Sequence, residues 1–416
     1  MKGRWNKALS LLVTAAMTVS LCAAGARAAA YGAEPVRVIV EMEDAAVLES
    51  AEARAAGASA YARSDGGTAA AARLLSAQKA LQQRIVAEAD RNAEVVYTYT
   101  SVFNGFSLRT DAAGVSAIRA MEGVKNVYPV RMAQITDPAP EGGADDEIAG
   151  DGSGMLPSGP DIGLEAMWDM GYDGRGQVIA VIDSELDVTH PMFAGEVEDP
   201  ALTLEGLETL LAENTFNADA SAKRLYRSSK LPFVYDYYDR DTDTYNSNFD
   251  AVHGTHVSGI AAGRDGELDG ESVSGMAPQA QLVFMKVGGE DGQLPDDAAI
   301  AAIDDAAKLG VCAINMSFGT MWKYYSEPYE KSIAAAKAAG ILLSVAIGNS
   351  SRGDGFAAWA DMPDYDASGM PDSLTGSLSV AAYEPAYRVM NYYTAQFRHG
   401  TEEETVQASL FGESSA

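Results

Sequence analysis

Three polar residues in the second half of the chain could together perform acyl transfer. Asp183 follows an apolar run, His253 opens the stretch His-Gly-Thr-His-Val-Ser-Gly, and Asn349 follows a glycine after another apolar run. A buried carboxylate can orient a histidine, and that histidine can act as a general base. The three residues therefore indicate hydrolysis of an acyl bond, with a nucleophile still to be found.

Each of these residues also has an ordinary structural interpretation. An Asp after a strand commonly caps a turn, a histidine at a helix start can cap that helix, and Gly-Asn is a frequent turn. A metal pair of His253 with His256 is a further alternative. It is disfavoured because the zincin motif places its histidines at i and i+4 with a Glu between them, and no third ligand is indicated.

The elements around these residues predict an α/β fold with a parallel sheet sandwiched by helices. From Gly174 onward, apolar strand-like runs alternate with helical segments, and residues 192–250 are expected to form a long polar insertion. Asp296 or Asp297 is expected near the N-cap of one helix. Such alternation is typical of parallel sheets covered on both faces. Ligands of these sheets bind beyond the carboxyl ends of the strands, where Asp183, Ser317 and Asn349 fall. We expect strands at 177–183, 281–287, 311–317 and 341–347, and helices at 253–263, 295–309 and 327–339.

A smaller unit is expected before this sheet. Residues 35–132 alternate between strand-like and helix-like segments and predict a small α+β domain. Residues 133–160 are rich in Pro, Gly and acids and predict a linker. Residues 1–29 combine a basic start, an apolar centre and the pattern Ala26-Arg27-Ala28, which is typical of a signal peptide. A membrane anchor is the alternative for that segment, although its apolar core is short.

Composition narrows the range of partners. The net charge of -29 argues against a nucleic-acid surface and suits a secreted protein. Only Cys22 and Cys312 are present, so we expect no structural disulfide, and we expect Cys312 to be a small buried residue. No metal site is assigned. Structural calcium is conceivable at an acidic loop, whose simpler interpretation is a solvated surface, because the spacing does not fit an EF-hand. The acids of that loop are Asp239, Asp241 and Asp243.

The sequence from His253 to Gly259, together with Asp183 and Asn349, resembles the subtilisin-like serine proteases, or subtilases. Around residues 362–393 the chain is most similar to lactocepin-like cell-envelope proteinases. The resemblance implies a subtilisin-like fold in which His253 is the general base, Asp183 orients it and Asn349 stabilises the oxyanion. It also implies that one segment pairs with an extended substrate, namely Ser317, Phe318 and Gly319.

The resemblance has one departure and extends to the N-terminal unit. Glu185 stands where subtilases usually have glycine, and a positive φ there would cost about 1 kcal/mol. Residues 101–106 and 121–129 are similar to the subtilase propeptide. This similarity implies that residues 35–132 are an inhibitor-like propeptide domain, which assists folding and blocks the site until it is removed.

The nucleophile is not found in this sequence. No Gly-Thr-Ser-Met-Ala-like motif follows Asn349. We therefore expect residues 161–416 to be a C-terminally truncated catalytic domain of a longer precursor, and the chain by itself to be inactive. Cell-envelope attachment would then be encoded downstream.

The leading hypothesis is a secreted or cell-envelope serine endopeptidase that cleaves extended polypeptides. The first alternative is a non-catalytic peptide-binding protein on a truncated subtilase scaffold. A nucleotide-binding α/β domain is a third hypothesis, which is disfavoured because no Gly-x-Gly-x-x-Gly turn follows the first strand.

Overall fold

We analysed a computed structural model of the 416-residue chain. The expected signal peptide, most of the expected linker and Asn349 lie outside the residues that the structure describes. The described residues are 35–56, 61–134, 162–213, 215–245, 253–268, 271–289, 292–319, 325–348, 371, 374, 376–381, 392–399 and 402–409.

The N-terminal unit is an antiparallel sheet covered by helices. Its strands lie in the order β2-β3-β1-β4. Alternating apolar residues of β1, such as Val38 and Val40, pack with Leu81 and Ile85 of the long helix α4. Helix α4 begins where Ser64 accepts a hydrogen bond from the Gly67 N–H, which is an N-cap. The elements are β1 (Val36–Met42), η1 (Val47–Glu49), α2 (Ala51–Ala56), α4 (Asp65–Glu88), β2 (Glu94–Tyr99), β3 (Gly105–Thr110), α5 (Ala112–Arg119) and β4 (Val124–Pro129).

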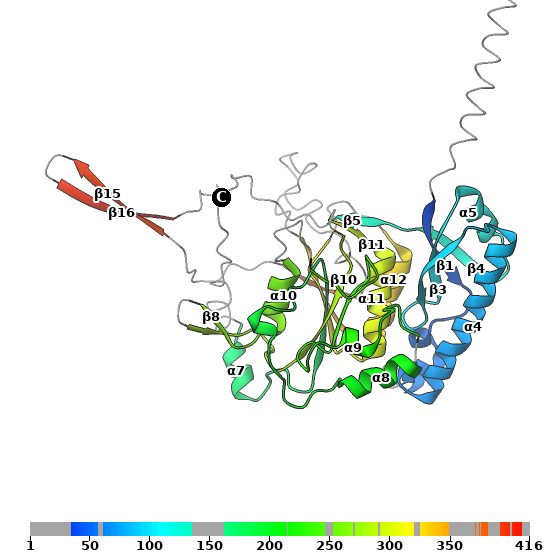
Figure 1. The fold of residues 1–416 in the computed structure, drawn as a ribbon, viewed down its shortest axis with the longest axis horizontal. Helices are drawn as coiled ribbons and strands as arrows, with labels where there is room; N and C mark the ends of the chain where they lie inside the picture. The colour runs from blue at the N-terminus through cyan, green and yellow to red at the C-terminus, as the bar shows by residue number, and fades with distance from the viewer. Residues whose placement is uncertain are drawn as a thin grey trace, which may run out of the picture.

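The second unit is a six-stranded parallel sheet in the order β14-β13-β12-β6-β10-β7. Helix α10 lies on one face, while α11 and α12 lie on the other (Figure 1). The predicted fold class, a helix-covered parallel sheet preceded by a small α+β domain, is therefore confirmed. The elements are β6 (Val178–Asp183), β7 (Phe233–Asp236), α10 (His253–Ala262), β10 (Gln281–Lys286), α11 (Asp296–Leu309), β12 (Ala313–Met316), α12 (Glu327–Ala338), β13 (Leu342–Ala346) and β14 (Leu378–Val380).

Shorter elements complete the described structure. They include a two-stranded pairing of β5 with β11 and the two hairpins β8–β9 and β15–β16. No described helix is both long enough and apolar enough to span a bilayer. These elements are β5 (Met132–Gln134), α7 (Leu164–Asp169), η3 (Pro191–Phe193), α8 (Leu204–Glu213), α9 (Ala222–Leu225), β8 (Gly266–Leu268), β9 (Glu271–Val273), β11 (Gln293–Pro295), β15 (Tyr392–His399) and β16 (Glu402–Ser409).

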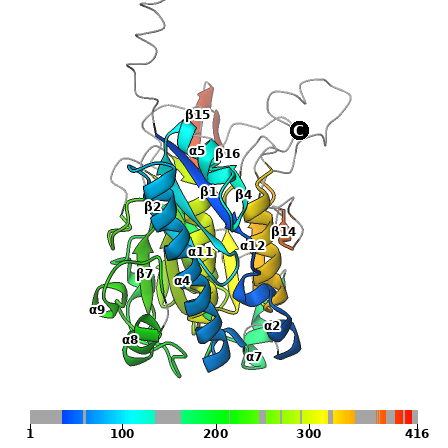
Figure 2. The same ribbon diagram turned by 90° about the vertical axis from the view of Figure 1, so that its right-hand side faces the viewer.

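Helix α11 is buried along its whole length because it lies between the two units. The central sheet is on one side of it and the sheet of the N-terminal unit is on the other (Figure 1). Figure 2 is seen from the side of the N-terminal unit, which lies in front of α11 in that view. All its residues are buried, including four aspartates and Lys308. Because buried charges require partners, this helix carries most of the polar contacts between the units.

Two sequence expectations are wrong. The segment 192–250 was expected to be a polar insertion, but it contains β7, whose residues Phe233 to Asp236 are fully buried at the edge of the central sheet. The strand is only four residues long and ends in an aspartate, so it gave little strand signal. Cys312 was expected to be buried but is exposed, because it lies just before β12 begins.

Candidate active site

The last residue of β6 and the first residue of α10 form an acid–histidine pair. Strand β6 lies in the middle of the sheet, so its carboxyl end opens at the centre of that edge. Asp183 Oδ1 lies 2.7 Å from His253 Nδ1. The Asp183 side chain is fully buried, whereas the His253 side chain is 34% exposed. A fixed acid therefore holds an imidazole that reaches the surface.

The surroundings of Asp183 fix it further. The backbone N–H of Ser184 donates to Asp183 Oδ1 at 2.7 Å, and the Ser184 hydroxyl donates to the same oxygen at 3.0 Å. Within the described part of the chain, the second carboxylate oxygen is buried with no hydrogen-bond partner. A carboxylate at His253 Nδ1 favours the tautomer protonated there, which leaves Nε2 as the proton acceptor.

The turn after β6 is joined to the first turn of α10 by two further links. Glu185 Oε1 accepts a hydrogen bond from the Gly254 N–H at 2.9 Å. The Asp187 N–H donates to the Thr255 hydroxyl at 2.9 Å. Residues 183, 185 and 187 of the turn therefore contact residues 253, 254 and 255 of the helix, respectively. These three contacts align the turn with the start of α10.

Gly254 is required by this close approach. A Cβ at this position would lie 2.1 Å from the Glu185 carbonyl oxygen and 3.1 Å from the ring of Phe284. No side chain fits there unless α10 moves away from the turn. The glycine thus lets the helix carrying His253 pack directly onto the backbone after Asp183.

Glu185 is not strained, although it stands at a position where subtilases usually have glycine. The described non-glycine residues with positive φ are Asp199, Arg240 and Asp265, so Glu185 has an ordinary backbone conformation. Its side chain is 2% exposed. Burial raises the pKa of the Glu185 carboxyl, and hydrogen bonds from Ser184 and Gly254 partly offset that rise.

The structure also contains a strand-binding edge that the sequence analysis missed. Strand β5, which follows the N-terminal unit, pairs antiparallel with β11, and both lie near the carboxyl end of the central sheet (Figure 1). The peptide N–H of Asp296 donates to the Arg131 carbonyl at 2.9 Å. Asp296 Oδ1 accepts from the Arg131 N–H at 3.0 Å, and Ser326 donates to Oδ2 at 2.7 Å. Asp296 therefore holds both backbone groups of one residue in the added segment.

The other predicted site residues differ in burial and in whether the structure describes them. Phe318 is 5% exposed and belongs to the main apolar core, so its side chain is not at the surface. Ser317 and Gly319 are half-buried after β12, and Asn315 donates to the Ser317 hydroxyl at 3.0 Å. His256 is exposed one turn beyond His253. Asn349 lies outside the described residues, so its position relative to His253 is not part of this geometry.

The acidic loop considered for calcium uses its carboxylates locally. Asp241 Oδ1 accepts the Asp243 N–H at 2.8 Å, and Asp243 Oδ1 accepts the Tyr245 N–H at 3.1 Å. Across the described ranges, no group of three or more His, Cys, Asp or Glu side chains is arranged to hold a metal ion.

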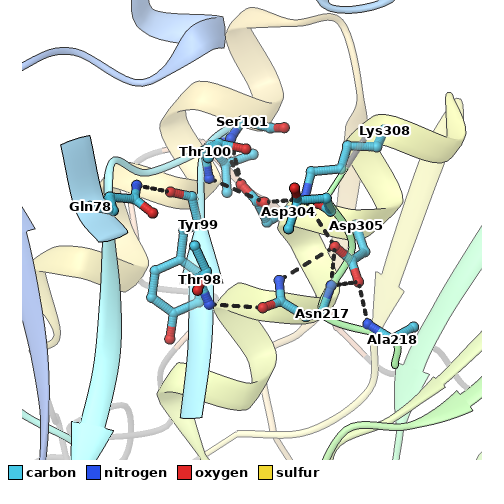
Figure 3. A network of polar contacts seen from close by, with 12 residues as sticks. Gln78, Thr98, Tyr99, Thr100, Ser101, Asn217, Ala218, Asp304, Asp305 and Lys308 are labelled. Carbon is cyan, nitrogen blue, oxygen red and sulfur yellow. Dashed lines mark hydrogen bonds and ion pairs between the residues drawn. The ribbon is translucent and has the colours of Figure 1, made fainter. Parts of the chain in front are cut away.

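The N-terminal unit is fixed over α11 by a second cluster of carboxylates. Figure 3 shows Asp304 pointing at the loop after β2. Its carboxylate accepts hydrogen bonds from the N–H groups of Thr100 at 3.3 Å, Ser101 at 2.7 Å and Val102 at 2.9 Å. Lys308 Nζ neutralises Asp304 at 2.7 Å. One buried ion pair thus caps three consecutive backbone groups of the N-terminal unit.

The adjacent Asp305 extends this cluster to a third segment. Its carboxylate accepts the N–H groups of Asn217 and Ala218, and Lys308 lies 3.0 Å away (Figure 3). The Asn217 side chain in turn accepts the Thr98 N–H of β2 at 2.8 Å. Burial raises the pKa of Asp305, and Lys308 partly offsets that rise. Two pairs of aspartates in an otherwise Ala-rich helix were the available sequence signal for this cluster.

Two family models match the chain. The model of the subtilase family matches residues 174–407, and that of peptidase inhibitor I9 matches residues 37–136.

Three curated proteins illustrate the similarity. The PI-type proteinase of Lactococcus lactis subsp. cremoris is 27% identical over 326 residues, which cover 75% of this chain and 16% of that protein. The minor extracellular protease Vpr of Bacillus subtilis is 26% identical over 317 residues, covering 75% and 33%. The C5a peptidase of Streptococcus pyogenes is 33% identical over 223 residues, covering 51% and 18%. The chain spans about one sixth of the length of the PI-type proteinase.

Proposed function

The chain belongs to the subtilase family, and we propose that it supplies the acid–base pair of a serine endopeptidase. The observation that carries this proposal is the 2.7 Å contact between Asp183 Oδ1 and His253 Nδ1 at the carboxyl end of the central sheet. The relatives named as proteinases and peptidases support proteolysis in general. The roles of the individual residues in this reaction are our own assignment.

In this proposal His253 Nε2 accepts the proton of a serine hydroxyl as the serine oxygen attacks the carbonyl carbon of the substrate. Asp183 keeps the imidazole in the reactive tautomer and stabilises the imidazolium that forms. Asn349 donates to the oxyanion of the tetrahedral intermediate. The imidazolium then protonates the leaving amine, and water releases the acyl group by the same steps in reverse order. We place the serine outside these 416 residues, because no Gly-Thr-Ser-like motif follows Asn349.

We propose an extended polypeptide as the substrate. The pairing of β5 with β11 supports this assignment, because the edge already accepts an added antiparallel strand through main-chain hydrogen bonds. Asp296 would hold the backbone of the residue that takes the place of Arg131. Ser317 and Gly319 would offer backbone groups on the other side of the bound peptide. This mode of binding recognises the extended backbone conformation of a peptide first and its side chains second.

We further propose that residues 35–132 act as the propeptide of the enzyme. The match to the I9 inhibitor model supports this assignment, as does the extensive burial of α11 beneath the unit. While β5 is paired with β11, no substrate strand can use that edge. Release of the unit would follow cleavage after Gln134, in the segment predicted to be a linker. A signal peptide at residues 1–29 would direct the precursor to secretion or to the cell envelope.

The test is peptide hydrolysis by the product of the native gene, compared with its His253→Ala variant. His256→Ala is the matched control, since His256 lies on the same helix one turn away. Loss of the general base should lower kcat by about 10⁶, whereas the control should stay within several-fold of the wild type. Retention of activity within tenfold in His253→Ala would contradict the proposal.

A second candidate function is peptide binding without chemistry. The β5–β11 pairing favours it independently of His253. In that case the native product, freed of residues 1–134, would bind extended peptides, and it would hydrolyse none of them even with His253 intact. The hydrolysis assay and a binding assay on the same sample separate the two functions.

A further inference from the structure

A second buried carboxylate lies beside the acid–histidine pair. Glu185 is two residues after Asp183 and is 2% exposed, although Glu is rarely buried this completely without a partner. Its Oε1 accepts the Gly254 N–H at 2.9 Å, and Gly254 directly follows His253. The proposed reaction assigns a role to Asp183 but none to Glu185.

The position of Glu185 relative to α10 explains what it can do. The first N–H groups of a helix have no partner within the helix, and the positive end of the helix dipole attracts an anion. Glu185 satisfies one of these groups on the residue after His253. Because a Cβ at Gly254 would meet the Glu185 carbonyl oxygen at 2.1 Å, backbone and side chain of Glu185 both abut the same helical residue. The backbone carbonyl and the side chain of Glu185 therefore both hold the start of α10.

We propose that Glu185 is a positioning residue, which fixes the first turn of α10 and thereby the orientation of the His253 ring toward Asp183. The catalytic consequence rests on the proposed function, but the effect on the imidazole does not. Glu185 occupies the usual glycine position in the Asp-Ser-Gly turn that the chain resembles. In this chain a side-chain carboxylate has been added to the junction without backbone strain.

The charge of Glu185 gives the proposal a second consequence. The charged groups that act on it are Asp183 from β6 and His253 from α10, while the group that β10 brings to this junction is the apolar ring of Phe284. An ionised Glu185 stabilises the protonated form of His253, as Asp183 does. Removing that charge while keeping the hydrogen-bond acceptor should therefore make His253 easier to deprotonate.

The experiment is an NMR pH titration of the full chain with ¹⁵N-labelled histidine. The chain has four histidines, and His253→Ala identifies the signal of interest. Glu185→Gln keeps an acceptor for the Gly254 N–H, whereas Glu185→Ala removes it. Glu208→Gln is the matched control, since Glu208 is exposed on α8. We expect Glu185→Gln to lower the His253 pKa by roughly half a unit to one unit with the Nδ1–H tautomer kept.

Glu185→Ala should lower the pKa as well and also speed exchange of the His253 Nδ1–H with water, because the ring is no longer held. The Gln variant should rescue that exchange rate. The proposal is overturned if both variants keep the pKa within about 0.2 units of the wild type. A fall in thermal stability with an unchanged His253 signal also overturns it, because it would assign Glu185 a merely structural role. Since this readout needs no hydrolysis, a Glu185 effect in the chain combined with no hydrolysis by the native gene's product would refute the proposed function alone.

Discussion

Two regions of the molecule bury carboxylates against N–H donors, yet they differ in the kind of partner. At the end of β6, the partner of Asp183 is a histidine whose ring is one third exposed. Along α11, the partners of Asp304 and Asp305 are backbone N–H groups and Lys308, all of them enclosed between the two units. The first partner can gain and lose a proton near neutral pH, and the others cannot.

The kind of partner distinguishes a region suited to catalysis from a region that attaches the N-terminal unit. A carboxylate that faces a titratable, surface-reaching imidazole can stabilise a charge that appears and disappears during a reaction. A carboxylate that caps fixed N–H groups gains only a stable contact. Changes in the first region should therefore alter rate with little effect on stability, and changes in the second should do the reverse.

The largest expected effect is on rate, from Asp183→Asn. The amide would favour the wrong tautomer of His253, so kcat of the native gene's product should fall by about 10⁴. The free energy of unfolding should change by no more than about 1 kcal/mol, since a buried charge is removed together with its contact. Steady-state kinetics and urea denaturation on the same sample measure both. A large loss of stability with little loss of rate would contradict the proposed difference between the regions.

Lys308→Met should have the next largest effect, on stability. The substitution leaves Asp304 and Asp305 buried without their cation and should cost about 3–5 kcal/mol in the uncleaved chain. Lys337→Met, on the exposed face of α12, is the matched control and should be nearly neutral. Once the N-terminal unit has been removed, kcat of the Lys308 variant should stay within a few-fold of the wild type. An equally small cost in both variants would show that the cluster does not hold the units together.

Gly254→Ala should be an exception within the first region, because it changes packing rather than the charge of a carboxylate. The new Cβ would overlap the Glu185 carbonyl, so α10 must shift, and we expect a loss of about 1–3 kcal/mol. Gly259→Ala on the same helix adds a Cβ with no atom within 4 Å and should be neutral or slightly stabilising. Chemical denaturation gives both values. The Gly254 variant should also lose the Asp183–His253 hydrogen bond, visible as loss of the downfield Nδ1–H proton signal.

Asp296→Asn should act on the pH dependence of stability. Burial, together with Asp297, raises the pKa of Asp296 to about 7. Between about pH 4 and 7 the folded chain therefore keeps a proton that the unfolded chain has released, so stability falls as pH rises through that window. The variant should reduce this slope by at most about 1.4 kcal/mol per pH unit. Urea denaturation of the uncleaved chain at several pH values measures it, and an unchanged slope would contradict the assigned ionisation.

Much of the fold could be predicted from the sequence because its signals are local. The apolar runs before Asp183 and Ser317 were long enough to indicate strands, and their alternation with helices specified a parallel sheet. Strand β7 was missed because three apolar or aromatic residues followed by an aspartate carry little periodicity. The approach of Asp183 to His253 was implied by the resemblance to subtilases, and the distance between them could come only from the structure.

The contacts that hold the site in place could not be predicted, since they join residues far apart in the chain. Asp296 was expected near a helix N-cap and directly follows the N-cap residue Pro295, but its contact with the backbone of Arg131 could come only from the structure. The sequence indicated only that Glu185 stands at a usual glycine position, and only the packing of α10 shows its contact with Gly254. Local patterns do not specify which buried acid meets which distant N–H.

The central claim is that Asp183 and His253 activate a serine. Its most direct test is reaction of the native gene's product with a fluorophosphonate, followed by mapping of the modified peptide. We predict that one serine is labelled in the wild type and that labelling is lost in His253→Ala. An unlabelled wild type, or equal labelling of wild type and His253→Ala, would contradict the account.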